Sequence, residues 1–361
     1  MTRSIKNPHN YVSERFAPKV IAIIGGMGSM GRRLAEEFKR DGYEVRLTGE
    51  APLREIGPTD SKEWKRALSR WNRSICKGAD VVVFSVPIPL LANGNGLEEI
   101  FGRTPARGWR DKLVIDICST KSGPVRAMAP LKGATVIGTH PMFGPKVQTL
   151  EGQTVFVCPV RHEADQHILN ARLRVRLSWL KSFWEQRGVT VVEISPEEHD
   201  AFMPSVQFSV LLSVLLYGDG LRQSGVSLDR VQLHGTPNSR TLCSRLARMI
   251  SAQMLPTYVN LAFDNSLNLE WLDRAAETLA TIRRALNSRN REHLRAFISR
   301  LVEWQSEDFR ANYSDLSVFL DECAAKRAFL TGCLARESQV RELLARPVVR
   351  EESHPPKGRK M

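Results

Sequence analysis

Buried strands and amphipathic helices alternate along the first half of the chain. Short, continuous apolar runs such as KVIAII are typical of parallel strands that are covered on both faces. We predict strands at residues 19–24, 43–47, 79–87, 112–117, 134–138, 154–159 and 189–194. Helical patterns lie between them, and the first has Leu34 and Phe38 four residues apart and ends at Gly42. This alternation predicts an α/β Rossmann-type doubly wound domain.

The strand pattern stops near residue 195, and an all-α helical dimerisation domain is predicted to follow. The segment PEEHD, from residue 196, has the proline and acids of a helix start. The apolar run VQFSVLLSVLLYG is too short to span a bilayer, and we expect it to form a buried helix. The predicted parts are a flexible N-terminus (1–17), the doubly wound domain (18–195), the helical substrate and dimerisation domain (196–335) and a disordered basic tail (336–361).

The helical domain carries more apolar surface than one short layer of helices would bury. We therefore predict a homodimer that forms through residues 196–330. The apolar positions on which this rests are Leu215, Leu216, Leu261, Phe263, Leu267, Leu269, Trp271 and Leu272.

Charge and cysteine content narrow the class of protein. The formal net charge is +13, but the basic residues are scattered and often stand beside acids, which argues against a nucleic-acid partner and suits a small anionic substrate. The six cysteines lie far apart, which predicts free thiols and no metal site. The N-terminal residues have no apolar core, so we expect a cytoplasmic protein with no membrane partner.

A glycine-rich loop follows the first predicted strand and opens the first predicted helix. In this context the pattern GxGxxG binds a dinucleotide. We assign the tight turn to Gly26, the close backbone approach to the pyrophosphate to Gly28, and the close packing of helix on strand to Gly31. The loop residues predicted to hold the cofactor are Gly26, Met27, Gly28, Ser29, Met30 and Gly31.

The end of the second predicted strand selects between NAD and NADP. Gly49 stands where an acid would bind the ribose 2′-OH of NAD, and Glu50 comes one residue later. Arg54 is close enough in sequence to meet the 2′-phosphate of NADP. We predict NAD, bound through Glu50, with NADP as the alternative.

Polar clusters follow three of the predicted strands. Ser85, Val86 and Pro87 follow one strand and are predicted to contact the cofactor, whereas CSTKSGP and THPMFGP follow the next two. Ligands of a doubly wound sheet bind beyond the carboxyl ends of its strands. Ser119 and His140 are therefore expected to approach each other near the nicotinamide, which makes His140 a candidate catalyst rather than a turn residue.

At these positions the chain resembles the prephenate dehydrogenase family, and most closely the dehydrogenase half of the bifunctional chorismate mutase/prephenate dehydrogenases. The resemblance covers about residues 19–320. It implies NAD(P)-dependent oxidative decarboxylation of prephenate to 4-hydroxyphenylpyruvate in tyrosine biosynthesis. The segments that carry it are GGMGSMGR, VVFSVPI, STKSGP, GTHPMFGP and PEEHD.

The resemblance also implies roles for individual residues. His140 would take the proton of the substrate's C4 hydroxyl, and Ser119 would hydrogen-bond the same hydroxyl. Arg248 aligns with an arginine that binds a substrate carboxylate, although Arg245, one turn away, competes with it and an exposed helix arginine is the simpler interpretation. Gln207 either faces the substrate cleft or is a core amide. His199 is read as structural, near a helix start.

One position departs from the family pattern and keeps other functions open. Leu211 stands where the family often has a histidine that holds the substrate. The alternatives are a 4-amino-4-deoxyprephenate dehydrogenase of secondary metabolism and a non-catalytic dinucleotide-binding homologue. The β-hydroxyacid dehydrogenases are discounted, because they need a catalytic lysine on the first helix of the second domain and residues 197–220 contain none.

Overall fold

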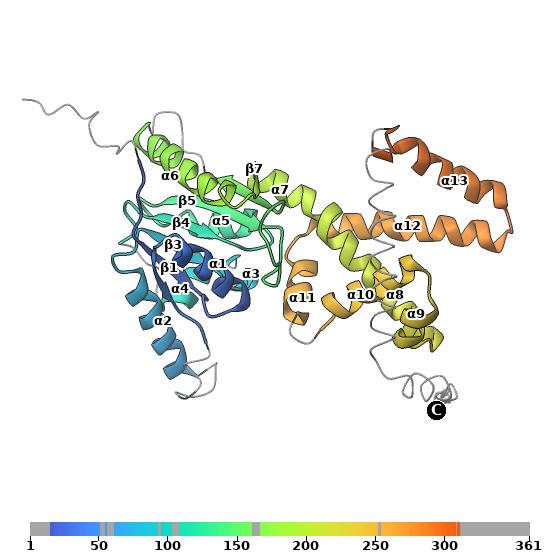
Figure 1. The fold of residues 1–361 in the computed structure, drawn as a ribbon, viewed down its shortest axis with the longest axis horizontal. Coiled ribbons are helices and arrows are strands. Elements are labelled where there is room, and N and C mark those ends of the chain that lie inside the picture. The colour runs from blue at the N-terminus through green and yellow to red at the C-terminus, as the bar shows by residue number, and fades with distance from the viewer. Residues whose placement is uncertain are drawn as a thin grey trace, which may run out of the picture. The chain divides into compact units, whose positions relative to one another are not determined.

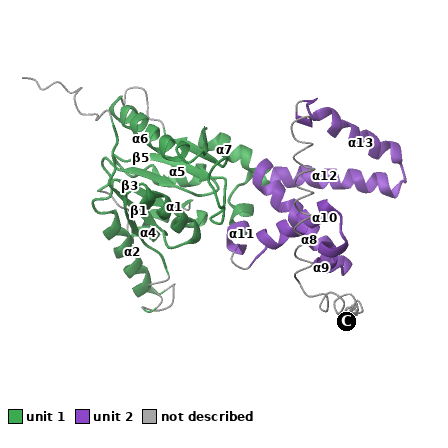
Figure 2. Ribbon diagram, viewed as in Figure 1, with its two compact units in different colours: residues 1–204, 259–268 green, residues 205–258, 269–361 purple. Residues whose placement is uncertain are grey.

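The structure is a computed structural model of the 361-residue chain. It describes residues 15–50, 55, 61–92, 95–102, 108–160, 167–251, 254–307 and 309–310. The chain forms two compact units, which Figure 2 shows in different colours. The first unit comprises residues 1–204 and 259–268, and the second comprises residues 205–258 and 269–361. The division of the sequence at residue 195 stays a prediction.

A seven-stranded sheet forms the centre of the first unit, in the order β2-β1-β3-β4-β5-β6-β7. Neighbouring strands are parallel, except that β5 and β6 are antiparallel. All seven predicted strands are present, and the doubly wound fold is confirmed. The strands are β1 (Val20–Ile24), β2 (Glu44–Leu47), β3 (Val81–Phe84), β4 (Leu113–Asp116), β5 (Thr135–Pro141), β6 (Thr154–Pro159) and β7 (Thr190–Glu193).

Helices cover both faces of the sheet, as Figure 1 shows for α6 and α2. Successive strand residues point to opposite faces, so Ile21 and Ile23 of β1 join one core and Ala22 and Ile24 join the other. On the first face lie α1 (Ser29–Arg40) and α6 (His167–Glu185). On the second lie α2 (Lys62–Cys76), α3 (Ile88–Ala92), α4 (Gly96–Phe101) and α5 (Ser122–Met128).

The strand that carries His140 is longer than predicted. We expected it to end before His140, but β5 continues through Pro141 and all seven of its residues are buried. The cause is pairing with β6, in which His140 stands opposite Phe156. Pro141 is tolerated at the last position of the strand, where the ladder needs no further N–H from it. His140 is therefore held by the sheet rather than by a turn.

A buried carboxylate joins α1 to α6. Glu37 is 1% exposed, and its carboxylate lies 2.6 Å from Arg40 and 3.0 Å from Arg187. Arg187 also lies 2.8 Å from Asp41 and stacks over Phe183, with its guanidinium carbon 3.9 Å from the ring centre. This network fixes the helix that follows the glycine loop against the far end of α6.

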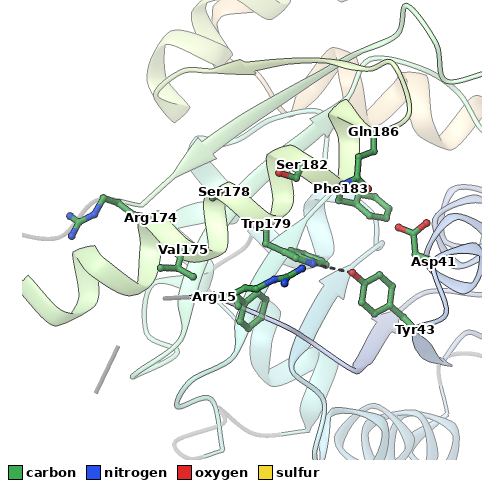
Figure 3. Close-up of a pocket in the computed structure, with 11 residues that line it drawn as sticks. Arg15, Asp41, Tyr43, Arg174, Val175, Ser178, Trp179, Ser182, Phe183 and Gln186 are labelled. Atoms are coloured by element: carbon green, nitrogen blue, oxygen red, sulfur yellow. Dashed lines mark hydrogen bonds between the residues drawn. The ribbon is translucent and has the colours of Figure 1, made fainter. Parts of the chain in front are cut away.

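A pocket of about 540 Å³ opens beside α6, and Figure 3 shows its walls. Its lining includes Phe16, Tyr43 and Trp179, and the indole N–H of Trp179 donates to the hydroxyl of Tyr43 at 3.1 Å. Tyr43 precedes β2, so this pocket lies at the amino end of that strand. It is therefore separate from any site at the carboxyl edge of the sheet.

The helices after the sheet begin with a well-defined cap. In α7 (Pro196–Met203) the side chain of Ser195 accepts from the backbone N–H of Glu198, and the Glu198 side chain accepts from the N–H of Ser195. A π-helical turn, η2 (Pro204–Phe208), joins α7 to α8 (Ser209–Ser224). Pro204 cannot donate the hydrogen bond that a regular α-helix requires there.

The second unit is built from helices, as predicted. They pack closely at Gly218, where a Cβ atom would lie 2.8 Å from the side chain of Leu246 on α10. α11 and α12 run across the boundaries between the two units. The helices are α9 (Leu228–His234), α10 (Pro237–Met249), α11 (Leu255–Phe263), α12 (Leu267–Asn287) and α13 (Arg291–Trp304).

The expectation that residues 206–218 form a buried helix is wrong. Leu211 and Val214 are buried, but Val210, Leu215 and Leu216 are 44–50% exposed. The other described helices cover only part of the apolar surface of α8. By length and composition alone, the run Pro196–Ser224 would also be able to cross a membrane, and 28% of its most apolar window is buried within the chain.

Candidate active site

The glycine-rich loop turns at Gly25, immediately after β1. Gly25 has a φ of +74°, and a Cβ atom there would lie 2.2 Å from the carbonyl oxygen of Ser85. From the sequence, this turn was predicted at Gly26. Gly26 is instead a position of close packing, since its Cβ would lie 2.7 Å from the side chain of Leu47, and a Cβ at Gly31 would lie 2.6 Å from the Cα of Gly26.

The loop presents the start of α1 to a ligand. Gly28 is the N-cap of that helix, and a Cβ there would contact only the carbonyl oxygen of Gly25, at 3.2 Å. The first turn of α1 contains no acidic residue. The first N–H groups of a helix have no partners within it and attract anions, so this arrangement suits a phosphate group.

A buried polar network supports the loop from the end of β2. The carbonyl oxygen of Thr48 accepts from the backbone N–H of Met27 at 3.0 Å. The Thr48 hydroxyl donates to Asn72 at 2.7 Å, and the Asn72 amide donates to the carbonyl of Ile100 at 2.7 Å. The loop is thereby anchored to α2 and α4.

His140 belongs to a chain of hydrogen bonds that the sequence analysis did not foresee. Its Nδ1 lies 2.9 Å from Nε2 of His199, and Nδ1 of His199 lies 2.9 Å from the carboxylate of Asp200. Asp200 also accepts from the backbone N–H groups of Lys121 at 2.7 Å and Ser122 at 2.8 Å, at the start of α5. His140 and His199 are 3% and 0% exposed.

This chain of hydrogen bonds determines where the protons sit. A carboxylate can only accept, so Nδ1 of His199 carries a proton and donates it to Asp200. Nε2 of neutral His199 is then an acceptor, and Nδ1 of His140 must donate to it. The lone pair of His140 is left on Nε2, which is the arrangement that a general base requires.

The charge states agree with this assignment. Burial lowers the pKa of His140 well below its ordinary value of 6.5, and the nearby His199 and Lys121 lower it further. Burial also lowers the pKa of His199, against the opposing effect of its bond to Asp200. Burial alone would raise the pKa of Asp200, but the hydrogen bonds from His199, Ser122 and Lys121 outweigh it, so this pKa is lowered. At neutral pH both histidines are neutral and Asp200 is charged.

A buried ion pair braces the loop that carries Ser119. The ammonium of Lys121, which is 0% exposed, pairs with Asp116 at the end of β4 and donates to the carbonyl of Thr139 at 2.6 Å. Burial raises the pKa of Asp116, and Lys121 opposes this rise. The pair ties the loop to the residue before His140.

Three strand ends meet at this edge of the sheet. β4 and β5 are parallel, with Asp116 paired to Gly138, so half-buried Ser119, which follows β4, and buried His140, near the end of β5, lie at the same edge of the sheet. Ser85, Val86 and Pro87 follow β3 there, and the Cys118 thiol lies 3.7 Å from the carbonyl oxygen of Val86.

The predicted substrate residues belong to the second unit. Arg248 is exposed in the last turn of α10, and Gln207 is half-buried in the π-helical turn. Arg245 is exposed as well. Leu211 is 2% exposed, so its side chain is buried. The roles of Arg248 and Gln207 in substrate binding stay predictions.

His199 and Asp200 are the residues whose importance the sequence analysis missed. His199 was read as structural, and Asp200 was given no role. The signal was an adjacent His–Asp pair on the first helix after the sheet. The segment 259–268 supports them, since the side-chain amide of Asn265 donates to the backbone carbonyl of Asp200 at 2.7 Å. In the described ranges between residues 15 and 310, no group of three or more His, Cys, Asp or Glu side chains is arranged to hold a metal ion.

The family model described as "Prephenate dehydrogenase, nucleotide-binding domain" matches residues 34–193. A protein of Methanocaldococcus jannaschii named "Probable arogenate/prephenate dehydrogenase" is 29% identical over 232 residues, which are 64% of this chain and 48% of that protein. Over its nucleotide-binding part, the chain is similar to the prephenate dehydrogenase family.

A second relative resembles the chain over a larger share of its length. The T-protein of Enterobacter agglomerans is 26% identical over 285 residues, which are 79% of this chain and 67% of that protein. The chain thus spans about half the length of the M. jannaschii relative and about two thirds of the T-protein.

Solved structures of prephenate dehydrogenases share the fold. The enzyme from Aquifex aeolicus, solved with hydroxyphenyl propionate and NAD+, matches with a TM-score of 0.51 and 19% identity, over 85% of this chain and 99% of that one. A putative prephenate dehydrogenase from Corynebacterium glutamicum matches with a TM-score of 0.54 and 15% identity, over 84% of this chain and 97% of that one.

Proposed function

We propose that this chain is an NAD(P)-dependent dehydrogenase that converts prephenate into 4-hydroxyphenylpyruvate and CO2. The observation that carries the proposal is the buried chain of hydrogen bonds from Asp200 through His199 to His140. It directs the lone pair of a neutral imidazole to Nε2 at the carboxyl edge of the sheet. The similarity to arogenate and prephenate dehydrogenases supports the same chemistry.

The residues around the glycine-rich loop fit a nicotinamide dinucleotide. Side chains at Gly25 or Gly31 would collide with the backbone, whereas Gly28 leaves its side of the loop open beside the start of α1. In this proposal the pyrophosphate is held by residues 26–31, and the nicotinamide end is contacted by residues 85–87. A bound nicotinamide would supply the hydride acceptor.

The reaction places one proton on the protein for part of the cycle. A hydride leaves C4 of prephenate while the proton of the C4 hydroxyl goes to Nε2 of His140, which leaves a carbonyl group at C4. Loss of CO2 from C1 then makes the ring aromatic, and the C4 oxygen takes the proton back from His140 to give 4-hydroxyphenylpyruvate. Ser119 hydrogen-bonds the same hydroxyl and orients it. Proton transfer to a positioned base contributes about 10²–10⁴-fold to the rate. Because the hydrogen bonds already orient the imidazole, His140 is ready to accept a proton before substrate arrives.

The substrate carries two carboxylates, and we assign one of them to Arg248. A guanidinium binds a carboxylate through two parallel hydrogen bonds. The overall basic charge of the chain favours the approach of such an anion. Gln207 is proposed as a polar contact to the same substrate.

Leu211 favours a second candidate substrate. It is buried in an apolar helix, where the resemblance places a substrate-binding histidine, so part of the substrate contact differs here. In 4-amino-4-deoxyprephenate an amine replaces the C4 hydroxyl, and His140 would receive a proton from it in the same way.

The proposed enzyme is a cytoplasmic homodimer, without a nucleic-acid or membrane partner. The second unit leaves large apolar side chains uncovered, including Leu279 at 51%, Leu286 at 63% and Trp304 at 83% exposure. Such an apolar surface is expected to be covered by a second copy. Light scattering at micromolar concentration should show a dimer, and a monomer would contradict this assignment.

The test of function is the absorbance of the reduced nicotinamide at 340 nm. The purified chain is mixed with NAD or NADP and with prephenate, arogenate or 4-amino-4-deoxyprephenate in turn. Reduction with prephenate supports the proposal, and reduction with only one of the other two substrates would replace prephenate by that compound. If none reacts while the dinucleotide still binds, the proposed activity is wrong.

A further inference from the structure

The end of β2 has no place for the acid that selects NAD. A Cβ atom at Gly49 would lie 2.5 Å from the Cβ of Met27 and 3.1 Å from its Cγ. Met27 cannot move aside easily, because its backbone N–H donates to the carbonyl of Thr48 and its carbonyl accepts from Arg32. The space that a carboxylate at residue 49 would use is thus filled by the apolar side chain of Met27.

A guanidinium is bonded to the backbone of the same methionine. Nε of Arg32 donates to the carbonyl oxygen of Met27 at 2.7 Å, and Arg32 is exposed. Among the described residues its terminal nitrogens have no partner, and no described ion pair includes Arg32. By contrast Arg33, the next residue, lies 3.3 Å from the carboxylate of Glu37.

These two features bear on the adenosine ribose of the cofactor. In doubly wound sites the ribose lies at the end of the second strand, where an acid accepts from the 2′-OH and an arginine accommodates a 2′-phosphate. Here a glycine replaces the acid, and a cation with unused donors is bonded to the backbone of Met27, whose side chain lies against that glycine. An acid would also repel a 2′-phosphate, and that repulsion is absent at residue 49.

We propose that the ribose end of this site accepts a 2′-phosphate, that Arg32 binds it, and that the chain therefore uses NADP at least as well as NAD. This inference rests on the proposed function only in taking the cofactor to be a nicotinamide dinucleotide. In this proposal the side chain of Met27 fills the space beside Gly49. An acid that would bind the 2′-OH of NAD therefore has no room at residue 49. Glu50, the acid one residue later, is exposed, and this proposal gives it no part in selecting the cofactor.

The test is direct binding of NADP and NAD to the full chain, measured by calorimetry without substrate. The wild-type chain should bind NADP at least as tightly as NAD. Arg32→Gln should weaken NADP binding about tenfold, because a charge-assisted hydrogen bond is lost, and should change NAD binding little. Arg46→Gln is the matched control, because Arg46 on β2 is already bonded to Glu44 and to the carbonyl of Lys77.

A pair of substitutions tests the steric argument. Gly49→Asp alone should weaken both cofactors, since it collides with Met27, whereas Gly49→Asp with Met27→Gly should bind NAD more tightly than NADP. The proposal is overturned if the wild-type chain binds NADP tenfold more weakly than NAD, or if Arg32→Gln weakens both cofactors equally. Because binding is measured without turnover, a failure of the proposed dehydrogenase activity would leave this result unaffected.

Discussion

Replacement of Asp200 by asparagine should stop His140 from acting as a base, although His140 itself is not substituted. The carboxylate accepts three hydrogen bonds, from Lys121, Ser122 and His199, at 2.7, 2.8 and 2.9 Å. An asparagine has one oxygen and one NH2 group in their place. If its oxygen stays on Lys121 and His199, the NH2 group opposes the N–H of Ser122.

In the other orientation the NH2 group faces both His199 and the N–H of Lys121, because these two share one carboxylate oxygen. His199 would then accept at Nδ1 and carry its proton on Nε2, which forces His140 to accept at Nδ1. The proton of His140 would move to Nε2, and the base would be lost. Turnover should therefore fall by about 10²–10⁴, the contribution of a general base, while the KM for prephenate changes little.

The free energy of unfolding should also fall, by an amount that follows from the number of hydrogen bonds lost. One or two hydrogen bonds to a charged group are lost, each worth about 1.5–3 kcal/mol, so we expect a loss of about 2–4 kcal/mol in the free energy of unfolding. Rates would be followed at 340 nm, and stability by urea unfolding followed by circular dichroism.

Glu197→Gln is the matched control for this prediction. Glu197 is an exposed acid in the first turn of the same helix, and its substitution should leave both rate and stability unchanged. A folded Asp200→Asn enzyme with wild-type turnover would refute the reasoning, because it would show that the orientation of His140 does not depend on Asp200.

Three further predictions follow from the same structure. His140→Asn should fold normally and lose about 10²–10⁴ of the turnover number, and a near wild-type rate in the 340 nm assay would remove His140 from its role. The folded chain should lose stability as the pH falls below about 6.5, because the lowered pKa values of His140 and His199 let the unfolded chain bind protons that the native chain does not. Melting temperatures at about pH 7.5 and pH 5.5 check this, and His140→Asn should reduce the difference. Glu37→Gln should destabilise the chain by about 3 kcal/mol in urea unfolding, because it removes the buried carboxylate that pairs with Arg40 and Arg187 and leaves Arg187 only its pair with Asp41, and an unchanged midpoint would contradict that.

Most of the sheet could be predicted from the sequence, because strands buried on both faces are continuous apolar runs. The start of α7 could also be predicted, since Ser195, Pro196 and Glu198 form a local capping pattern. The short helices α3, α4 and α5 were not predicted, because each has at most seven residues and is held by contacts with the sheet rather than by its own periodicity.

The active site was predictable only in part. The edge of the sheet where His140 and Ser119 lie follows from strand order alone. The partners of His140 do not, because His199 is 59 residues away and reaches it through the packing of α7 on β6. The turn at Gly25 and the block at Gly49 depend on contacts with Ser85 and Met27 that no local pattern encodes.

The chain passes between its two compact units three times, after residues 204, 258 and 268. A nucleotide-binding module cut at residue 204 would therefore lack residues 259–268, and with them the Asn265 amide that bonds to the backbone of Asp200. The hydrogen-bonded chain that ends at His140 is thus assembled from two separate stretches of the polypeptide. Neither unit can be inherited, exchanged or fused to another protein as a single contiguous segment without dividing the machinery that orients its histidine.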